Sequence, residues 1–456
     1  MNKSQKNISP QLSLFTITWP IFVELFLQVV MGSSDTIMLS HISDDAVAAV
    51  GVATQLIFLC ILIFNFVSSG TAVVLSQYLG AGLKNDARTV TAISISLNLV
   101  MGIVISLLMV IFKSELLLLF HLPEQIAELG EQYLTIVGGT VFIQAVLITV
   151  SAILRANGYT RDAMMVSILM NIIHLAGNAL FIYGLLGIPK LGVIGVSIST
   201  AVSRTIALVI IMKFMYARIP IKLKLKEYVS IDSLQIKKIL KIGIPAAGEQ
   251  ICYNLSQLAI TAIIAILGAA SLTTRVYTQN IMSYILVFGL AVGQGTQILI
   301  GYKAGARDFD GAYRQLLKSL KYSLFMTVGI AIFIAFFRET LMSFFTYDQE
   351  IVTLGSKLLL LCLILEPGRT FNLVVINALR ATGDANISLV MGVISMWGIS
   401  VSLAYYLGIH LGYGLPGIWI AFIADEWFRG ITMYFRWRSR AWEKKVLIQN
   451  QVTNSA

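Results

Sequence analysis

Acidic residues inside long apolar runs are the first chemically informative feature of the sequence. There are six such acids, and three arginines lie in the same runs, so negative charge dominates there. An ionised side chain is costly within a bilayer, so each acid is a candidate for holding a proton, Na⁺ or a positively charged ligand. The acids are Glu24, Asp35, Glu249, Glu366, Asp425 and Glu426.

Asp35 is the acid for which the sequence offers partners. It lies near the outer end of the first apolar run, in the sequence MGSSDT. A helix rises 1.5 Å per residue. Asn178 therefore lies about 22 Å along the predicted span 163–187, counted from its cytoplasmic end. Thr200 lies about 12 Å along the predicted span 192–216, counted from its outer end. All three therefore fall in the outer half of the membrane. Because carboxylate, amide and hydroxyl oxygens suit hard cations, we predict a cation site at Asp35, Asn178 and Thr200; the alternative for Asp35 is an interfacial residue or helix cap.

Glu249 and Glu24 are candidates for a second site, for a cation or for the substrate. Glu249 lies about 12 Å along its predicted helix from Lys241, toward the cytoplasmic end. Glu24 is its counterpart in an internal repeat described below. The alternative for both is a structural acid that is hydrogen-bonded to neighbouring helices.

The remaining charges inside the runs favour structural interpretations. Glu366 and Arg369 lie one helical turn apart, so we expect them to neutralise each other. Asp425, Glu426 and Arg429 are expected to form a similar local cluster.

Other polar residues give no sign of catalysis. We interpret His174 as a hydrogen-bonded bundle residue rather than a proton relay, and Arg155 and Arg380 as anchors at the inner leaflet. The sequence has no Walker A motif, no Ser/His/Asp arrangement and no His/Cys cluster. We therefore expect no enzyme activity, no organic cofactor and no metal ion beyond Na⁺.

The elements that carry these residues must be membrane helices. Of 456 residues, 57% are hydrophobic and 12% are charged, whereas a soluble domain has about 25% charged residues. The apolar runs are long enough to cross the hydrocarbon core. The predicted fold class is an all-α polytopic membrane protein, with twelve helices arranged as two parallel-oriented six-helix bundles around a central cleft. The expected spans are 12–39, 47–79, 89–112, 131–154, 163–187, 192–216, 239–267, 277–302, 313–337, 352–379, 386–409 and 415–437.

Basic residues predict the orientation. Of the 33 Lys and Arg residues, 25 fall in segments on the same side of the membrane as the N-terminus. Five fall on the opposite side, and Arg275 is one of these five. The other three lie within the predicted spans. Positive charge accumulates on the cytoplasmic side, so we expect a cell-membrane protein with both termini in the cytoplasm. No basic patch suggests nucleic acid. We predict an N-terminal lobe at 1–216, a cytoplasmic basic linker at 217–238 and a C-terminal lobe at 239–456.

An internal repeat relates the two lobes. A shift of 225 residues places Pro20 on Pro245, Glu24 on Glu249, Gly80 on Gly305 and LRANG at 154–158 on LRATG at 379–383. Six spans per repeat give both lobes the same orientation in the membrane. Such parallel repeats are typical of secondary transporters.

In combination these motifs resemble the multidrug and toxic compound extrusion (MATE) family, including its bacterial NorM-like members. The motifs are the Trp-Pro of the first helix followed by MGSSDT, Thr-Gln in the second helix, GAG at 80–82, LRANGYTRD, LRATGD, and DEWFRG before a basic tail. The resemblance implies a twelve-helix antiporter that exports cationic, amphipathic compounds in exchange for Na⁺ or H⁺. The partners it implies are organic cations and the lipid bilayer, and we expect a monomer.

The family pattern also assigns residues. The resemblance implies that Asp35 is the first-helix acid, that Asn178 and Thr200 help to coordinate the cation, and that Glu249 is the acid of helix 7. A second acid used by one branch of the family falls on Ile182, and an acid of helix 10 falls on Arg369. A flippase for lipid-linked oligosaccharides, from a related family, is the alternative function; a membrane protein that does not transport fits least well.

Overall fold

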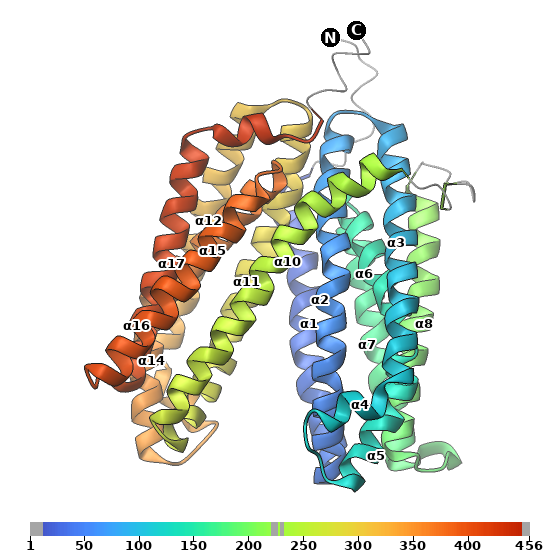
Figure 1. Ribbon diagram of the computed structural model, residues 1–456, viewed down its shortest axis with the longest axis vertical. Coiled ribbons are helices and arrows are strands. Elements are labelled where there is room, and N and C mark those ends of the chain that lie inside the picture. Colours follow the sequence, from blue (N-terminus) through green and yellow to red (C-terminus); the bar gives the residue numbers. More distant parts are fainter. Residues whose placement is uncertain (1–11, 220–226, 229–231, 449–456) are drawn as a thin grey trace. The chain divides into compact units, whose positions relative to one another are not determined.

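The computed structural model describes residues 12–219, 227–228 and 232–448 (Figure 1). It is 89% helical, and the residues described contain no β-strand. This follows from the sequence, because a chain surrounded by hydrocarbon must satisfy its backbone hydrogen bonds within each segment.

The first half of the chain contains six long spans and a short helix between the third and fourth. The fourth span is bent by 46° where a π-helical turn separates α5 from α6. The elements are α1 (Leu14–Ser40), α2 (Asp44–Gly80), α3 (Lys84–Ile111), α4 (Lys113–Leu118), α5 (Glu124–Tyr133), the π-turn Leu134–Gly138, α6 (Val141–Ala156), α7 (Thr160–Tyr183) and α8 (Gly192–Arg218).

The second half repeats this order. Its penultimate span contains two π-helical segments within an otherwise α-helical run. The elements are α10 (Ser233–Ile266), α11 (Ala269–Gly305), α12 (Phe309–Phe336), α13 (Arg338–Ser343), α14 (Gln349–Ala381), α15 (Ala385–Ser395), the π-segment Met396–Val401, α16 (Ser402–Tyr405), the π-segment Tyr406–His410 and α17 (Gly414–Arg438).

The described parts of the two halves together contain twelve membrane-spanning helices, six in each half. Among the described residues, nine helices are long and apolar enough to cross a membrane, and the bent pair of α5 and α6 makes a tenth. The other two long helices are α10, which begins with several lysines, and α17, which carries Asp425, Glu426 and Arg429. The predicted all-helical fold of twelve spans is confirmed.

The chain divides into two compact units. Unit 1 contains Val23–Leu75 and Leu83–Gly243, and α7 packs on α8 and α3 on α6 within it. Unit 2 contains Ser13–Phe22, Ser76–Gly82 and the chain from Ile244 onward, with α14 packed against α11, α12 and α17. Each unit has its own core of buried aliphatic side chains. Large apolar side chains are also exposed, as the lipid-facing surface of a membrane protein requires.

The predicted lobe boundaries at 216 and 239 stay a prediction. Most of the predicted basic linker at 217–238 lies outside the described residues. Of its described part, Glu227 forms an ion pair with Arg88 of α3 at 2.8 Å.

Repeat-equivalent glycines allow α2 and α11 to touch within unit 2. A Cβ atom added to Gly80 would collide with the carbonyl oxygen of Tyr302, and one added to Gly305 would collide with that of Gln77. Residues 77 and 302, like 80 and 305, are related by the shift of 225. The two helix ends therefore contact each other through the same positions of the repeat, and only glycine leaves room for the neighbouring backbone.

Candidate functional site

Asp35 lies in a polar cluster between α1 and α7 of unit 1. Its Oδ1 atom accepts a hydrogen bond from Asn178 Nδ2 at 2.9 Å and lies 2.9 Å from His174 Nε2. His174 and Asn178 are four residues apart on α7 and therefore project from one face of that helix. The Asp35 side chain is 31% exposed and that of His174 is 12% exposed. The carboxylate is thus held in place by two groups while it remains accessible.

Oxygen atoms and a guanidinium complete this cluster. The Tyr133 hydroxyl lies near Thr54 and Thr200, and the Thr200 hydroxyl donates to the carbonyl oxygen of Val196 at 2.9 Å. Arg204, one turn beyond Thr200 on α8, interacts electrostatically with both Tyr133 and Asp35. The cluster therefore combines one acid with a nearby fixed positive charge.

The amide oxygen of Asn178 is the atom best suited to a cation. Asn178 is fully buried, and no described residue donates a hydrogen bond to its Oδ1. A buried carbonyl oxygen without a partner costs free energy unless a ligand or proton compensates it. Together with the Asp35 carboxylate, this oxygen fits Na⁺ or a protonated group.

The structure brings Asp35 and Asn178 together, and Thr200 lies near Tyr133 in the same cluster. Their role as a cation site stays a prediction. His174, which the sequence indicates as a hydrogen-bonded bundle residue, has Asp35 itself as its partner. The spacing of four residues between His174 and Asn178 was the available signal. Arg204 is one of the three arginines inside the apolar runs, which was its signal, and Tyr133 carried none.

Glu24 and Glu249 each form an ion pair with an arginine in their own unit. Arg155 Nη1 lies 3.0 and 2.9 Å from the two carboxylate oxygens of Glu24, and Arg380 Nη2 lies 2.6 Å from Glu249 Oε2. The acids lie in α1 and α10, and the arginines end α6 and α14. Both pairs join residues 131 apart in sequence. Arg155 and Arg380 are the partners of these acids, and their expected position at the inner leaflet stays a prediction.

A second network of ion pairs lies between α14 and α17. Arg369 pairs with Glu366 at 2.8 Å and with Glu426 at 3.4 Å. Arg429 pairs with Asp425 at 3.0 Å and with Glu426 at 3.2 Å. The predicted pair and the predicted cluster are therefore both present, joined through Glu426.

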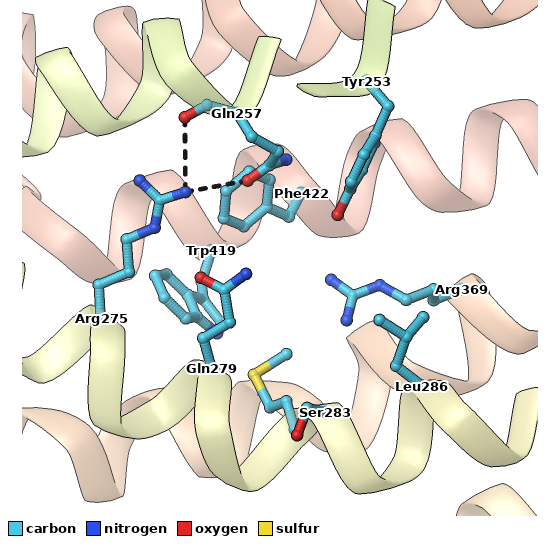
Figure 2. A pocket seen from close by; sticks show the side chains of 10 residues that line it. Tyr253, Gln257, Arg275, Gln279, Ser283, Leu286, Arg369, Trp419 and Phe422 are labelled. Atoms are coloured by element: carbon cyan, nitrogen blue, oxygen red, sulfur yellow. Dashed lines mark hydrogen bonds between the residues drawn. The ribbon is translucent and has the colours of Figure 1, made fainter. Parts of the chain in front are cut away.

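Unit 2 also contains a cavity of about 80 Å³. Figure 2 shows Arg275 and Arg369 facing it from opposite sides, with Gln279 of α11 and Trp419 of α17 between them. Arg275 was counted as a charge outside the spans, in the connection before a helix starting at 277. That expectation is wrong, because α11 begins at Ala269 and Arg275 lies inside the helix, only 7% exposed.

Known proteins similar to this chain are membrane transporters. The family model MatE matches residues 20–180 and again residues 245–406, two segments offset by the 225-residue shift of the repeat. A protein of Bacillus subtilis named uncharacterized transporter YisQ is 48% identical over 433 residues, which cover 95% of each chain. A protein of Thermotoga maritima named probable multidrug resistance protein NorM is 26% identical over 440 residues, 96% of this chain and 94% of that one.

Solved structures share the fold. A MOP superfamily transporter from Pyrococcus furiosus superposes with a TM-score of 0.86 at 20% identity, covering 95% of this chain and 96% of that chain. A variant of the MATE transporter VcmN from Vibrio cholerae superposes with a TM-score of 0.88 at 19% identity, covering 96% and 98%. With a family model that matches both halves and a relative this similar over almost its whole length, the chain belongs to the MATE family.

Proposed function

We propose that the chain is a secondary active transporter of the cell membrane that exports cationic, amphipathic compounds in exchange for Na⁺ or H⁺. The observation that carries this proposal is the Asp35 cluster, in which an accessible carboxylate lies beside the unpartnered amide oxygen of Asn178. Relatives named multidrug resistance proteins support export of foreign compounds. Transport rather than catalysis accounts for a chain built of spanning helices.

The proposed mechanism is competition for one negative charge. A driving cation and a positively charged substrate both favour an ionised Asp35, so binding of one opposes binding of the other at this site. If the two bind different conformations of the protein, their difference in affinity moves the protein between these conformations. Asn178 and Thr200 would position the cation, and Glu24 and Glu249 remain candidates for a second site whose charge is already matched by arginine.

The basic residues support the proposed orientation, with both termini in the cytoplasm. We also propose that the transporter works as a monomer. Cysteine-accessibility labelling at the two ends of α12 in intact cells would test the orientation.

Export of ethidium by cells that lack their own pumps tests the proposal. We expect Asp35→Asn to lower the efflux rate at least about tenfold at equal expression, since coupling free energies of 1–3 kcal/mol correspond to changes of this size. Asp45→Asn is the matched control, because Asp45 is an exposed acid at the start of α2. Efflux by Asp35→Asn equal to that of the parent would show that the proposed role is wrong.

Separate collapse of the sodium and proton gradients identifies the driving ion. Efflux that stops when one gradient is removed and continues without the other assigns the ion. Efflux that continues when both gradients are absent would contradict antiport.

A further inference from the structure

Arg275 is a buried cation that has no acid beside it in the part of the chain that the structure describes. Its Nη1 donates to Thr261 Oγ1 at 2.6 Å, and its Nη2 donates to Gln257 Oε1 at 3.0 Å. No carboxylate among the described residues lies within ion-pairing distance of Arg275. A buried charge is costly unless a charge of opposite sign compensates it.

Arg369, on the other side of the same cavity, is different. It contacts both Glu366 and Glu426, so its charge is matched within the protein. The electrostatic neighbour of Arg275, in contrast, is the phenol of Tyr253. The positive charge left uncompensated at this cavity therefore belongs to Arg275.

The cavity has the lining of a site for a carboxylate. Its volume of about 80 Å³ is several times the roughly 10–15 Å³ that one water molecule needs on the same measure, so a small ligand group can enter it. Amide groups of Gln257 and Gln279 and the hydroxyl of Ser283 line it, beside the rings of Trp419 and Phe422 (Figure 2). Guanidinium and amide donors suit a carboxylate, and the rings provide apolar contact for the atoms attached to it.

We propose that this cavity binds the carboxylate group of a small aromatic anion or zwitterion, with Arg275 as its counter-charge. Gln257 accepts a hydrogen bond from Arg275 through its oxygen, which orients the guanidinium and leaves the amide nitrogen as a donor. Gln279 lies on α11 one turn from Arg275 and faces the same space. As part of a transport path the site rests on the proposed function, and it extends the substrates from simple cations to zwitterions.

Calorimetric titration of the purified full-length protein with benzoate tests the site. Benzamide has the same shape without the charge and serves as the comparison ligand. We expect benzoate to bind and benzamide to bind at least about tenfold more weakly, because charged hydrogen bonds are roughly twice as strong as neutral ones. We expect Arg275→Gln to raise the Kd for benzoate at least about tenfold, and Arg275→Lys to keep part of the affinity because it keeps the charge.

Arg338→Gln is the matched control. Arg338 is an arginine of the same unit that donates to the carbonyl oxygen of Ala335 and does not line the cavity. Its Kd for benzoate should equal that of the parent. Benzoate binding that is unchanged in Arg275→Gln, or benzamide binding as tight as that of benzoate, would overturn the proposal.

A second variant keeps the test decisive if Arg275→Gln folds poorly. Gln279→Glu places a carboxylate four residues from Arg275 on the same helix face, where it can pair with the guanidinium. We expect this variant to raise the unfolding temperature and to abolish benzoate binding. Retained benzoate binding in Gln279→Glu would contradict the proposal. Because binding is measured without transport, its failure would leave the export proposal standing, and unchanged efflux in Asp35→Asn would leave the benzoate result standing.

Discussion

His174 is the residue that holds the Asp35 carboxylate together with Asn178. Its Nε2 lies 2.9 Å from Asp35 Oδ1, the oxygen that also accepts a hydrogen bond from Asn178 Nδ2. A carboxylate that loses one of these two partners is less firmly positioned for a ligand. We therefore expect His174→Ala to raise the Kd of the purified protein for ethidium, measured by fluorescence anisotropy.

His174→Gln is the conservative variant. Glutamine can donate a hydrogen bond to Asp35, so we expect it to keep more of the affinity for ethidium than His174→Ala does. His410→Ala replaces an exposed histidine of unit 2 and should bind ethidium as the parent does. A Kd of His174→Ala equal to that of the parent would rule out a positioning role for His174.

Residue type and depth were enough to predict that Asp35 and Asn178 lie at a similar level of their helices, because an acid and an amide are costly in apolar helices unless they bind a ligand or each other. Tyr133 was beyond prediction, since its role depends on the turn where α5 gives way to a π-helical segment. Arg275 was missed because the start of α11 was set eight residues too late. The sequence AASLTTRV is polar enough to resemble a loop, but in the structure its polar groups face the protein interior.

At the scale of elements, the crossing of α2 and α11 depends on glycine. A Cβ atom at Gly80 meets a backbone carbonyl of α11, which cannot move aside as a flexible side chain can. We expect Gly80→Ala to destabilise the protein by about 1–3 kcal/mol, the usual cost of overpacking. Gly305→Ala should have a similar effect, because it introduces the equivalent collision on the other helix. Thermal unfolding in detergent, followed by tryptophan fluorescence, measures both.

Gly51→Ala is the control in the same helix. A Cβ atom there has no neighbour within 4 Å, so only the backbone preference changes, and alanine favours the helix over glycine by up to about 1 kcal/mol. The variant should unfold at the same temperature as the parent or slightly above it. If Gly80→Ala behaved like Gly51→Ala, the close approach of α2 and α11 would not contribute to stability.

The twelve helices were predictable because apolar length is a strong signal, and the repeat was predictable for a related reason. The shift of 225 residues was found from coinciding glycines, prolines and charges. The structure gives a physical cause for two kinds of coincidence. Gly80 and Gly305 lie where α2 and α11 cross, each against the backbone of the other helix. Within each half, the acid of the first helix forms an ion pair with the arginine of the LRA motif. The irregular turns within spans were not predictable, since a π-helical segment has the same apolar composition as the α-helix around it.

At the scale of the whole molecule, the two repeated ion pairs can be either structural bonds or cation sites, and stability separates these roles. Glu24 and Glu249 are 6% and 7% exposed, and each pairs with one arginine. Removing one partner of a buried pair leaves the other charge uncompensated, which costs about 3–5 kcal/mol. For structural bonds we therefore expect Glu24→Gln and Glu249→Gln each to lower the unfolding temperature. The double variant should show the sum of the two effects, because the pairs share no residue.

Glu131→Gln provides the comparison. Its pair with Lys113, at 3.8 Å, has both side chains about one-third exposed, and exposed pairs contribute little, so its unfolding temperature should hardly change. Cation sites predict a different pattern: Glu24→Gln or Glu249→Gln would lose ethidium efflux while unfolding at the temperature of the parent. Measuring the unfolding temperature and the efflux rate of the same variants therefore shows whether each acid is structural or binds a cation. If the two acids differed, the repeat would have kept its geometry while its halves diverged in function.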